Sequence, residues 1–291
     1  MGNDEQINES QENTGARNWK LIVSYDGADY KGWQVQPGQV TIQGELREAL
    51  GRVTGESPLP QGSGRTDAGV HALAQVASFE LHAAIPEDNL LRALNRTLPE
   101  SIRVVSAERV DADFHARHST VVKTYEYRVF AECVPGEPRR ICTPFLSRYV
   151  LPYPWPLSLD ALNEAAQGFI GTHDFLSFAA TDPDETTREQ MERGVIEDED
   201  GEPVKNAIRT VFGSAWHEER TTDGVLLIYR VRGSGFLHHM VRNMVGTMLD
   251  VGRGYTAASA IAGMIAARAR SAAGPTAPAR GLFLHSVEYP E

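Results

Sequence analysis

Apolar residues alternate with polar ones along six stretches of the chain, and this period of two predicts β-strands. The first predicted strand begins at Trp19 and ends in a turn at Asp26 and Gly27. The other five span residues 75–81, 102–110, 121–130, 208–217 and 225–232.

Four other stretches place their apolar residues on one side of a helix. The first helix is predicted over residues 42–53, between Thr41 as its N-cap and Gly55, which ends it. The other predicted helices span residues 86–98, 159–169 and 237–249. The last of these has the most regular apolar stripe, which extends over three turns.

The order strand, helix, strands, helix occurs twice, once in residues 19–150 and again in residues 151–291. A proline-rich run, LPYPWPL at residues 151–157, connects the two parts. This order predicts an α+β protein in which two related halves form one continuous mixed or antiparallel β-sheet. We expect helices on one face of the sheet and a central catalytic cleft between the halves.

Acidic residues are concentrated in two segments of the chain. The 291 residues include 39 Asp and Glu against 28 Lys and Arg, a formal net charge of −11, which at first argues against a polyanionic partner. Residues 1–18 carry a net −3 and residues 181–207 a net −7. We interpret the first segment as a disordered acidic tail and the second as an acidic insertion. The remainder is nearly neutral, and the arginines between residues 92 and 148 are candidate phosphate contacts.

The composition also bounds the class of protein. It excludes collagenous, coiled-coil and disordered classes. Because no apolar stretch is long enough for a membrane span or for the core of a signal peptide, we expect a cytoplasmic protein. The two cysteines, Cys133 and Cys142, are too few for a disulfide framework and lack the spacing of a typical zinc pair, so we expect free thiols.

The most unusual local sequence is QGSGRTDAGVHA at residues 61–72. Its three glycines allow a tight turn that presents the Asp67 carboxylate beside the Arg65 guanidinium. A carboxylate held by an arginine stays ionised, so Asp67 could act as a nucleophile, a base or a metal ligand. The alternative is a polar turn with a structural Arg–Asp pair. A phosphate loop is disfavoured because no Lys follows the glycines.

Seven motifs, taken together and in order, closely resemble the tRNA pseudouridine synthase A (TruA) family. The resemblance extends from about Trp19 to Tyr289 and leaves out mainly the two acidic segments. The motifs are YDGADYKGWQVQP at residues 25–37, GRTDAGVHA at 64–72, FHAR at 114–117, KTYEY at 123–127, GTHDF at 171–175, GFLHHMVRNMVGTML at 235–249 and APARGLFL at 277–284.

This resemblance implies an enzyme that converts uridine to pseudouridine at positions 38, 39 and 40 in the anticodon stem-loop of tRNA, without a cofactor. It assigns the catalytic carboxylate to Asp67. A carboxylate suits this isomerisation because it can bond covalently to the sugar or base, or stabilise a glycal or oxocarbenium-like species. The family also implies a homodimer whose tRNA substrate spans both subunits.

The resemblance assigns four more site residues. Tyr125 would stack on the flipped base and is a candidate for removing the C5 proton, whereas Tyr127, on the same side of the strand, is the more plausible core aromatic. Arg242 would pair with Asp67; the alternative is an exposed surface arginine. Arg65 would fill the space left by the flipped base or bind phosphate, and Leu282 would line the pocket.

Pairs of histidines suggest a metal site, but the spacing of their neighbours does not support one. The pairs are His115 with His118, and His238 with His239. The first has no acidic or thiol partner at ligand spacing. We therefore expect no metal and interpret most histidines as surface, packing or RNA-contacting residues.

Two alternative functions remain open. The chain could be a pseudouridine synthase that acts on another RNA, or a non-catalytic RNA-binding protein on the same scaffold. The main departure from the family is residues 181–207, where a shorter connection is expected. Because acidic residues repel phosphate, we expect this segment to point away from Asp67 or to be mobile.

Overall fold

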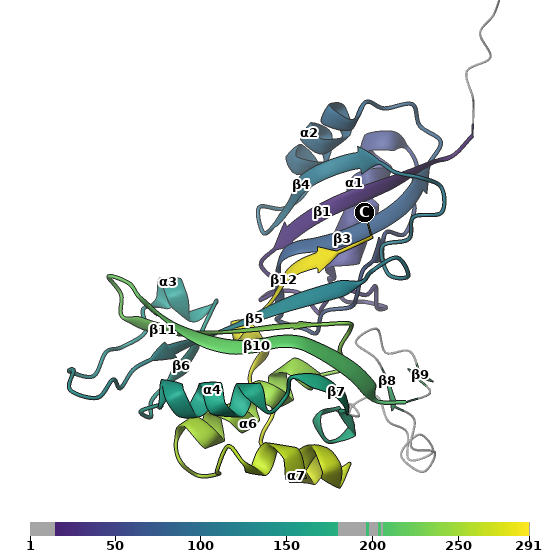
Figure 1. Ribbon diagram of the computed structural model, residues 1–291. Helices are drawn as coiled ribbons and strands as arrows, with labels where there is room; N and C mark the ends of the chain where they lie inside the picture. The colour runs from purple at the N-terminus through teal and green to yellow at the C-terminus, as the bar shows by residue number, and fades with distance from the viewer. Residues whose placement is uncertain (1–14, 180–195, 198–202, 205, 291) are drawn as a thin grey trace, which may run out of the picture.

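Figure 1 shows the computed structural model of the chain, which describes residues 15–179, 196–197, 203–204 and 206–290. Within these residues, no helix is both long enough and apolar enough to cross a membrane.

Ten strands form one mixed β-sheet, with the path β4-β1-β3-β12-β5-β11-β10-β7, while β2 pairs with β3 and β6 with β5. The β3–β12 and β5–β6 pairs are parallel and the others are antiparallel. The strands are β1 (Arg17–Tyr25), β2 (Gln61–Gly62), β3 (His71–Leu81), β4 (Ile102–Arg109), β5 (Val122–Ala131), β6 (Leu151–Tyr153), β7 (Gly171–Asp174), β10 (Ile208–Arg220), β11 (Val225–Gly233) and β12 (Leu282–Glu288).

The four predicted helices are all present. The α-helices are α1 (Ile42–Thr54), α2 (Glu87–Thr97), α3 (Pro144–Ser147), α4 (Leu159–Gln167), α6 (Met240–Gly252) and α7 (Ala260–Ala267). As predicted, the Thr41 hydroxyl caps α1 by accepting from the Gly44 N–H, and Gly55 ends the helix in the left-handed conformation. Helix α6 begins three residues later than predicted, because His239 has a left-handed backbone that interrupts the helix.

The main core lies between one face of the sheet and the helices. Every second residue of β5 faces this core, as shown by Tyr125, Tyr127 and Val129. Residues of β1, β3, β11 and β12 and of the longer helices pack against them. A smaller cluster covers the opposite face, where Phe130 of β5 packs near Leu146 of α3. The prediction of an α+β sheet with helices on one face is therefore confirmed, with the short α3 on the other face.

Strand β12 ties the end of the chain to its first half. It lies between β3 and β5, near the middle of the sheet (Figure 1). It pairs with β5 only as far as Tyr127. The next residues of that β5 edge, Val129–Ala131, pair with Leu151–Tyr153. The run at residues 151–157, predicted as a connector, therefore also contributes a strand, because β12 leaves part of the β5 edge open.

The structure describes only parts of the two acidic segments. Strand β1 begins at Arg17, which pairs with Leu81, so residues 17 and 18 belong to the sheet. At the other segment, β8 (Ile196–Glu197) pairs with β9 (Pro203–Val204). Ala207 is buried, and its C=O accepts from the Phe175 N–H. Most of the predicted tail and insertion lies outside the described residues.

Candidate active site

The loop that carries Asp67 joins β2 to β3 and is held by the segment of residues 25–33. The backbone N–H of Trp33 donates to the Thr66 C=O at 3.0 Å. The hydroxyls of Tyr25 and Thr66 hydrogen-bond at 2.8 Å. The first family-like motif therefore positions the residue directly before Asp67.

Two glycines allow this segment to approach the loop closely. Gly32 has a φ of 84°, and a Cβ at this position would overlap the Thr66 carbonyl oxygen. A Cβ on Gly27 would overlap the carbonyl oxygen of Val70. Glycine is therefore required at both positions, by the close approach and, at Gly32, also by the backbone conformation.

Arg242 reaches Asp67 from the first turn of α6. Its Nε donates to the Ala277 C=O at 2.8 Å, and the Ala277 N–H donates to the Arg242 C=O at 3.1 Å. These bonds direct the guanidinium so that Nη1 lies 2.8 Å from Asp67 Oδ2. The predicted pairing is confirmed, and the alternative of a surface arginine is wrong, because only 16% of the side chain is exposed.

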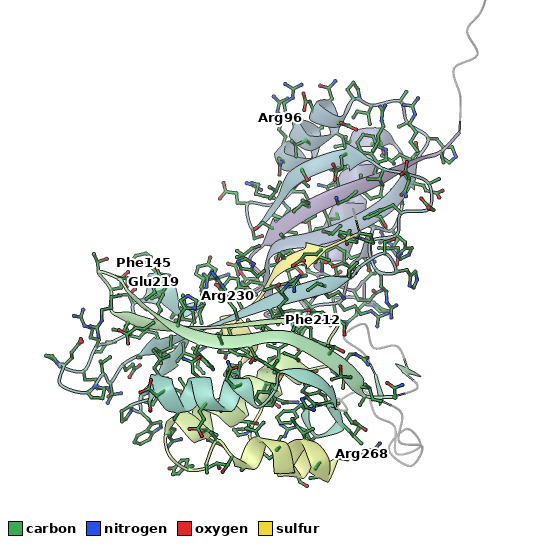
Figure 2. All side chains as sticks on the ribbon, viewed as in Figure 1. Arg96, Phe145, Phe212, Glu219, Arg230 and Arg268 are labelled. Carbon is green, nitrogen blue, oxygen red and sulfur yellow. The ribbon has the colours of Figure 1, made fainter. Side chains whose placement is uncertain are left out.

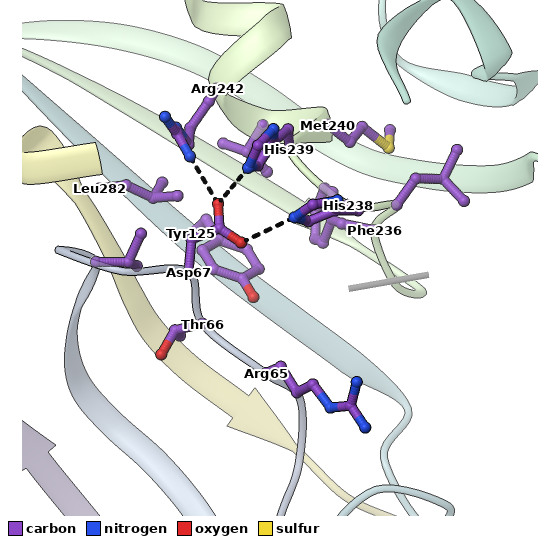
Figure 3. Close-up of a pocket in the computed structure, with 13 residues that line it drawn as sticks. Arg65, Thr66, Asp67, Tyr125, Phe236, His238, His239, Met240, Arg242 and Leu282 are labelled. Atoms are coloured by element: carbon purple, nitrogen blue, oxygen red, sulfur yellow. Dashed lines mark hydrogen bonds and ion pairs between the residues drawn. The ribbon is translucent and has the colours of Figure 1, made fainter. Parts of the chain in front are cut away.

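Two histidines complete the surroundings of the Asp67 carboxylate (Figure 3). His239 Nε2 lies 3.2 Å from Oδ2, and His238 Nε2 lies 3.4 Å from Oδ1. Burial raises the pKa of Asp67, but hydrogen bonds from both imidazoles and the positive charge they carry when protonated outweigh it. The net effect holds the pKa of Asp67 well below its usual value, so the carboxylate is ionised at neutral pH.

A narrow pocket opens beside this carboxylate, where β5 and β12 meet the segment before α6. Tyr125 and Leu282 line it from these strands, and both are nearly fully buried. The Tyr125 ring packs edge-on against Phe236 with centroids 5.2 Å apart. The enclosed part of the pocket has a volume of about 30 Å³, which is enough for one or two water molecules, and the pocket is open to solvent.

All five predicted site residues line this pocket: Arg65, Asp67, Tyr125, Arg242 and Leu282. The guanidinium of Arg65, however, points away from Asp67 (Figure 3). The prediction that Arg65 lies beside the carboxylate was therefore wrong, and the ion pair comes from Arg242 instead. As predicted, Tyr127 is a core residue, and its hydroxyl donates to the Pro278 C=O at 2.8 Å.

The contacts of His238 and His239 with Asp67 were not predicted from the sequence. Both residues are more than 170 positions from Asp67 in the sequence, so no local spacing indicates the contact. The available signal was their position directly before Met240, within one turn of Arg242, at the start of the helix with the most regular apolar stripe. Side chains at the first turn of a helix that carries a predicted site residue are candidates for the same site.

The nitrogen and oxygen donors of Asp67, His238 and His239 lie within 4.8 Å of one another, so these residues could hold a metal ion. Among the residues that the structure describes, no other such group occurs. The Arg242 guanidinium disfavours this use, because it already places a positive charge 2.8 Å from one of the two carboxylate oxygens.

Several arginines of the basic stretch have acidic partners within the chain. Arg148 Nη2 lies 3.0 Å from Asp26 and 2.7 Å from Asp29, and Arg139 pairs with Glu132 at 2.7 Å. Arg96 lies on α2, at the far end of the first half (Figure 2). The stretch therefore does not form one continuous, unneutralised cationic surface.

The other residues of note from the sequence have structural roles. His115 Nδ1 accepts from the backbone N–H groups of Arg117 and His118. Cys133 and Cys142 are free thiols, as predicted.

Comparisons with known proteins identify relatives over nearly the whole chain. The sequence model of a family described as tRNA pseudouridine synthase matches residues 21–119 and 165–290. The chain is 47% identical to tRNA pseudouridine synthase A of Solibacter usitatus, over 94% of this chain and all of the relative. It is 41% identical to the proteins of the same name from Bacillus pumilus and Moorella thermoacetica, over 93% of this chain and 98% of each relative.

These matches include the segments that bring Asp67 and Arg242 together and extend through β12, which carries Leu282. The identity is well above what a shared fold alone would give, and it covers both halves of the sheet. The chain belongs to the tRNA pseudouridine synthase family.

Proposed function

We propose that this protein isomerises uridine to pseudouridine at positions 38, 39 and 40 in the anticodon stem-loop of tRNA, with Asp67 as the catalytic residue. The observation that carries the proposal is an ionised carboxylate, paired with Arg242 at 2.8 Å, at the wall of a pocket lined by Tyr125 and Leu282. Pseudouridine formation needs such a carboxylate next to a site for a flipped base.

The reaction is balanced without a redox partner. The C1′–N1 bond breaks, the uracil rotates, and a C1′–C5 bond forms; C5 then loses its proton while N1 gains one. Asp67 assists either by bonding to the substrate or by stabilising a glycal or oxocarbenium-like species, and both routes use the ionised form. Arg242 would keep that form available by lowering the free energy of the carboxylate.

The pocket walls suggest how the base is held. Tyr125 would stack on the flipped uracil and is a candidate for removing the C5 proton, and Leu282 would pack against the ring. Arg65 lies at the pocket with its guanidinium directed away from Asp67 (Figure 3). In this orientation Arg65 could bind a phosphate or fill the space that the flipped base leaves, because neither role needs an ion pair with Asp67.

We expect no cofactor and no metal, since the Arg242 charge already neutralises the carboxylate. Turnover of a short anticodon hairpin, which folds in monovalent salt, should therefore survive removal of divalent ions with EDTA. We further propose a cytoplasmic homodimer that binds one tRNA across both subunits, and a division of the chain near residue 150 into two halves.

Release of tritium from tRNA labelled at uridine C5 tests the proposal. The wild-type protein should release tritium, and Asp67→Ala and the isosteric Asp67→Asn should not, while both variants still bind tRNA. Equal release by the wild type and the variants would refute the role of Asp67. Binding without any release by the wild type would favour a non-catalytic RNA-binding protein, and release only from other RNAs would favour a different substrate.

A further inference from the structure

His239 has a backbone conformation that costs energy. Its φ of 57° and ψ of 3° lie in the left-handed region, which residues other than glycine seldom adopt. Among the residues that the structure describes, only Arg268 shares this feature, with a φ of 50°. Such backbone strain persists where the surrounding structure holds it, and it is concentrated at functional sites.

The conformation does not serve to cap the helix. His239 is the N-cap residue of α6, yet its side chain makes no capping hydrogen bond. Instead its Nε2 lies 3.2 Å from Asp67 Oδ2. Adjacent side chains point in opposite directions on an extended chain. The turn at His239 lets the imidazoles of His238 and His239 lie with ring centroids 3.9 Å apart and both face one carboxylate.

The two oxygens of Asp67 are held unequally. Oδ2 has two partners, Arg242 Nη1 at 2.8 Å and His239 Nε2 at 3.2 Å. Oδ1 has a longer contact, with His238 Nε2 at 3.4 Å. Two donors from different directions fix both the position and the rotation of a carboxylate, whereas one donor leaves rotation free.

We propose that His239 is a positioning residue: together with Arg242 it fixes Asp67 Oδ2 and so presents Oδ1 to the ribose as the reacting oxygen. The strained backbone at His239 is what brings the second donor into place. This inference rests on the proposed pseudouridine synthase activity and adds to it the residue that orients the carboxylate and the oxygen that reacts.

Two substitutions separate positioning from a structural role. His239→Gly removes the imidazole but suits the left-handed backbone, whereas His239→Gln restores an N–H donor of similar reach but retains the backbone strain. We expect kcat for tritium release to fall by about tenfold to a hundredfold in His239→Gly, with KM nearly unchanged. We expect His239→Gln to recover part of that loss, although it should be no more stable to heat than His239→Gly.

Arg268→Gly is the matched control, because it relieves the same backbone conformation at the end of α7, at the outer edge of the second half (Figure 2). It should keep the wild-type kcat. The inference is wrong if His239→Gly keeps the same kcat as an active wild type and an active Arg268→Gly. It is also wrong if the kcat of His239→Gln is no higher than that of His239→Gly. A complex in which Oδ2 rather than Oδ1 contacts the ribose would also overturn it. An inactive wild type would instead refute the proposed function.

Discussion

At the scale of single residues, the charge state of Asp67 depends on its neighbours. Only 22% of its side chain is exposed, and such burial alone would favour the protonated acid. The imidazoles of His238 and His239 reverse this effect and hold the pKa of Asp67 well below its usual value. Arg242 adds a permanent positive charge at 2.8 Å. The carboxylate is therefore ionised at neutral pH.

The sign of this pKa shift predicts the acid side of the pH profile. Because the pKa of Asp67 is lowered, its protonation should reduce kcat only at a pH well below the one at which an ordinary aspartate is protonated. Arg242→Gln removes a positive charge, so the pKa of Asp67 should rise and the acid limb should move to higher pH, with kcat about a hundredfold lower. Arg242→Lys, which keeps the charge, should move the limb less. Measuring kcat for tritium release from pH 4 to 8 tests this prediction. It would be contradicted if the acid limb of Arg242→Gln lay at the same pH as that of the wild type.

At the scale of elements, the fold positions the carboxylate from two directions. The segment of residues 25–33 holds the loop before Asp67, and the segment of residues 275–277 holds the start of α6. Both segments pack closely against the backbone that they hold. A Cβ on Gly32 would overlap the carbonyl oxygen of Thr66, and a Cβ on Gly246 would overlap the carbonyl oxygen of Pro275. The distance between Asp67 and Arg242 thus depends on how these segments pack.

Two glycines test the packing of the first segment. Gly32 and Gly38 both have a positive φ, of 84° and 73°, but a Cβ on Gly38 would have no atom within 4 Å. Gly32→Ala should lower the free energy of unfolding by roughly 2 to 3 kcal/mol and reduce kcat, whereas Gly38→Ala should cost about 1 kcal/mol and leave kcat unchanged. Urea unfolding with tritium release measures both. Equal losses for the two variants would show that the clash with Thr66 does not matter.

At the scale of the whole molecule, one sheet carries both halves of the site. Tyr125 on β5 and Leu282 on β12 are in neighbouring strands, although β12 ends the chain. The loop with Asp67 enters β3 on the other side of β12, so three adjacent strands bring residues from both halves to one pocket. The acidic segments contribute most of the net charge of −11. Among the residues that the structure describes, none of those that line this pocket belongs to these segments.

The acidic insertion should therefore be dispensable. When residues 182–205 are replaced by a short Gly-Ser linker, kcat should stay within about threefold of the wild type. KM should stay the same or fall, because acidic residues that repel phosphate have been removed. Steady-state tritium release at several salt concentrations measures both. A large loss of kcat with an intact fold would show that the segment takes part in turnover.

Local patterns in the sequence predict much of the fold and part of the site. Three local predictions depend on near neighbours in the chain, and all are confirmed. They are the cap at Thr41, the end of α1 at Gly55, and the position of Tyr125 and Tyr127 on the face of β5 that is turned toward the helices. Sequence proximity misled for Arg65, which is two positions from Asp67 but points away from it. The Arg242 contact could be predicted only through the family resemblance.

What the sequence does not indicate depends on tertiary packing. The contacts of His238 and His239 with Asp67 form only when the start of α6 meets the loop before β3. The pairing of β6 with β5 likewise depends on where β12 ends along the β5 edge. Neither contact leaves a periodic or short-range trace in the chain.

The central claim is that Asp67 drives uridine isomerisation in the anticodon stem-loop, and mapping pseudouridine in an unmodified tRNA transcript tests it most directly. After incubation with the wild-type protein, pseudouridine should appear at uridines among positions 38, 39 and 40 and nowhere else. After incubation with Asp67→Asn, which should fold like the wild type, none should appear. Pseudouridine at these positions with Asp67→Asn, or only at other positions with the wild type, would contradict the claim.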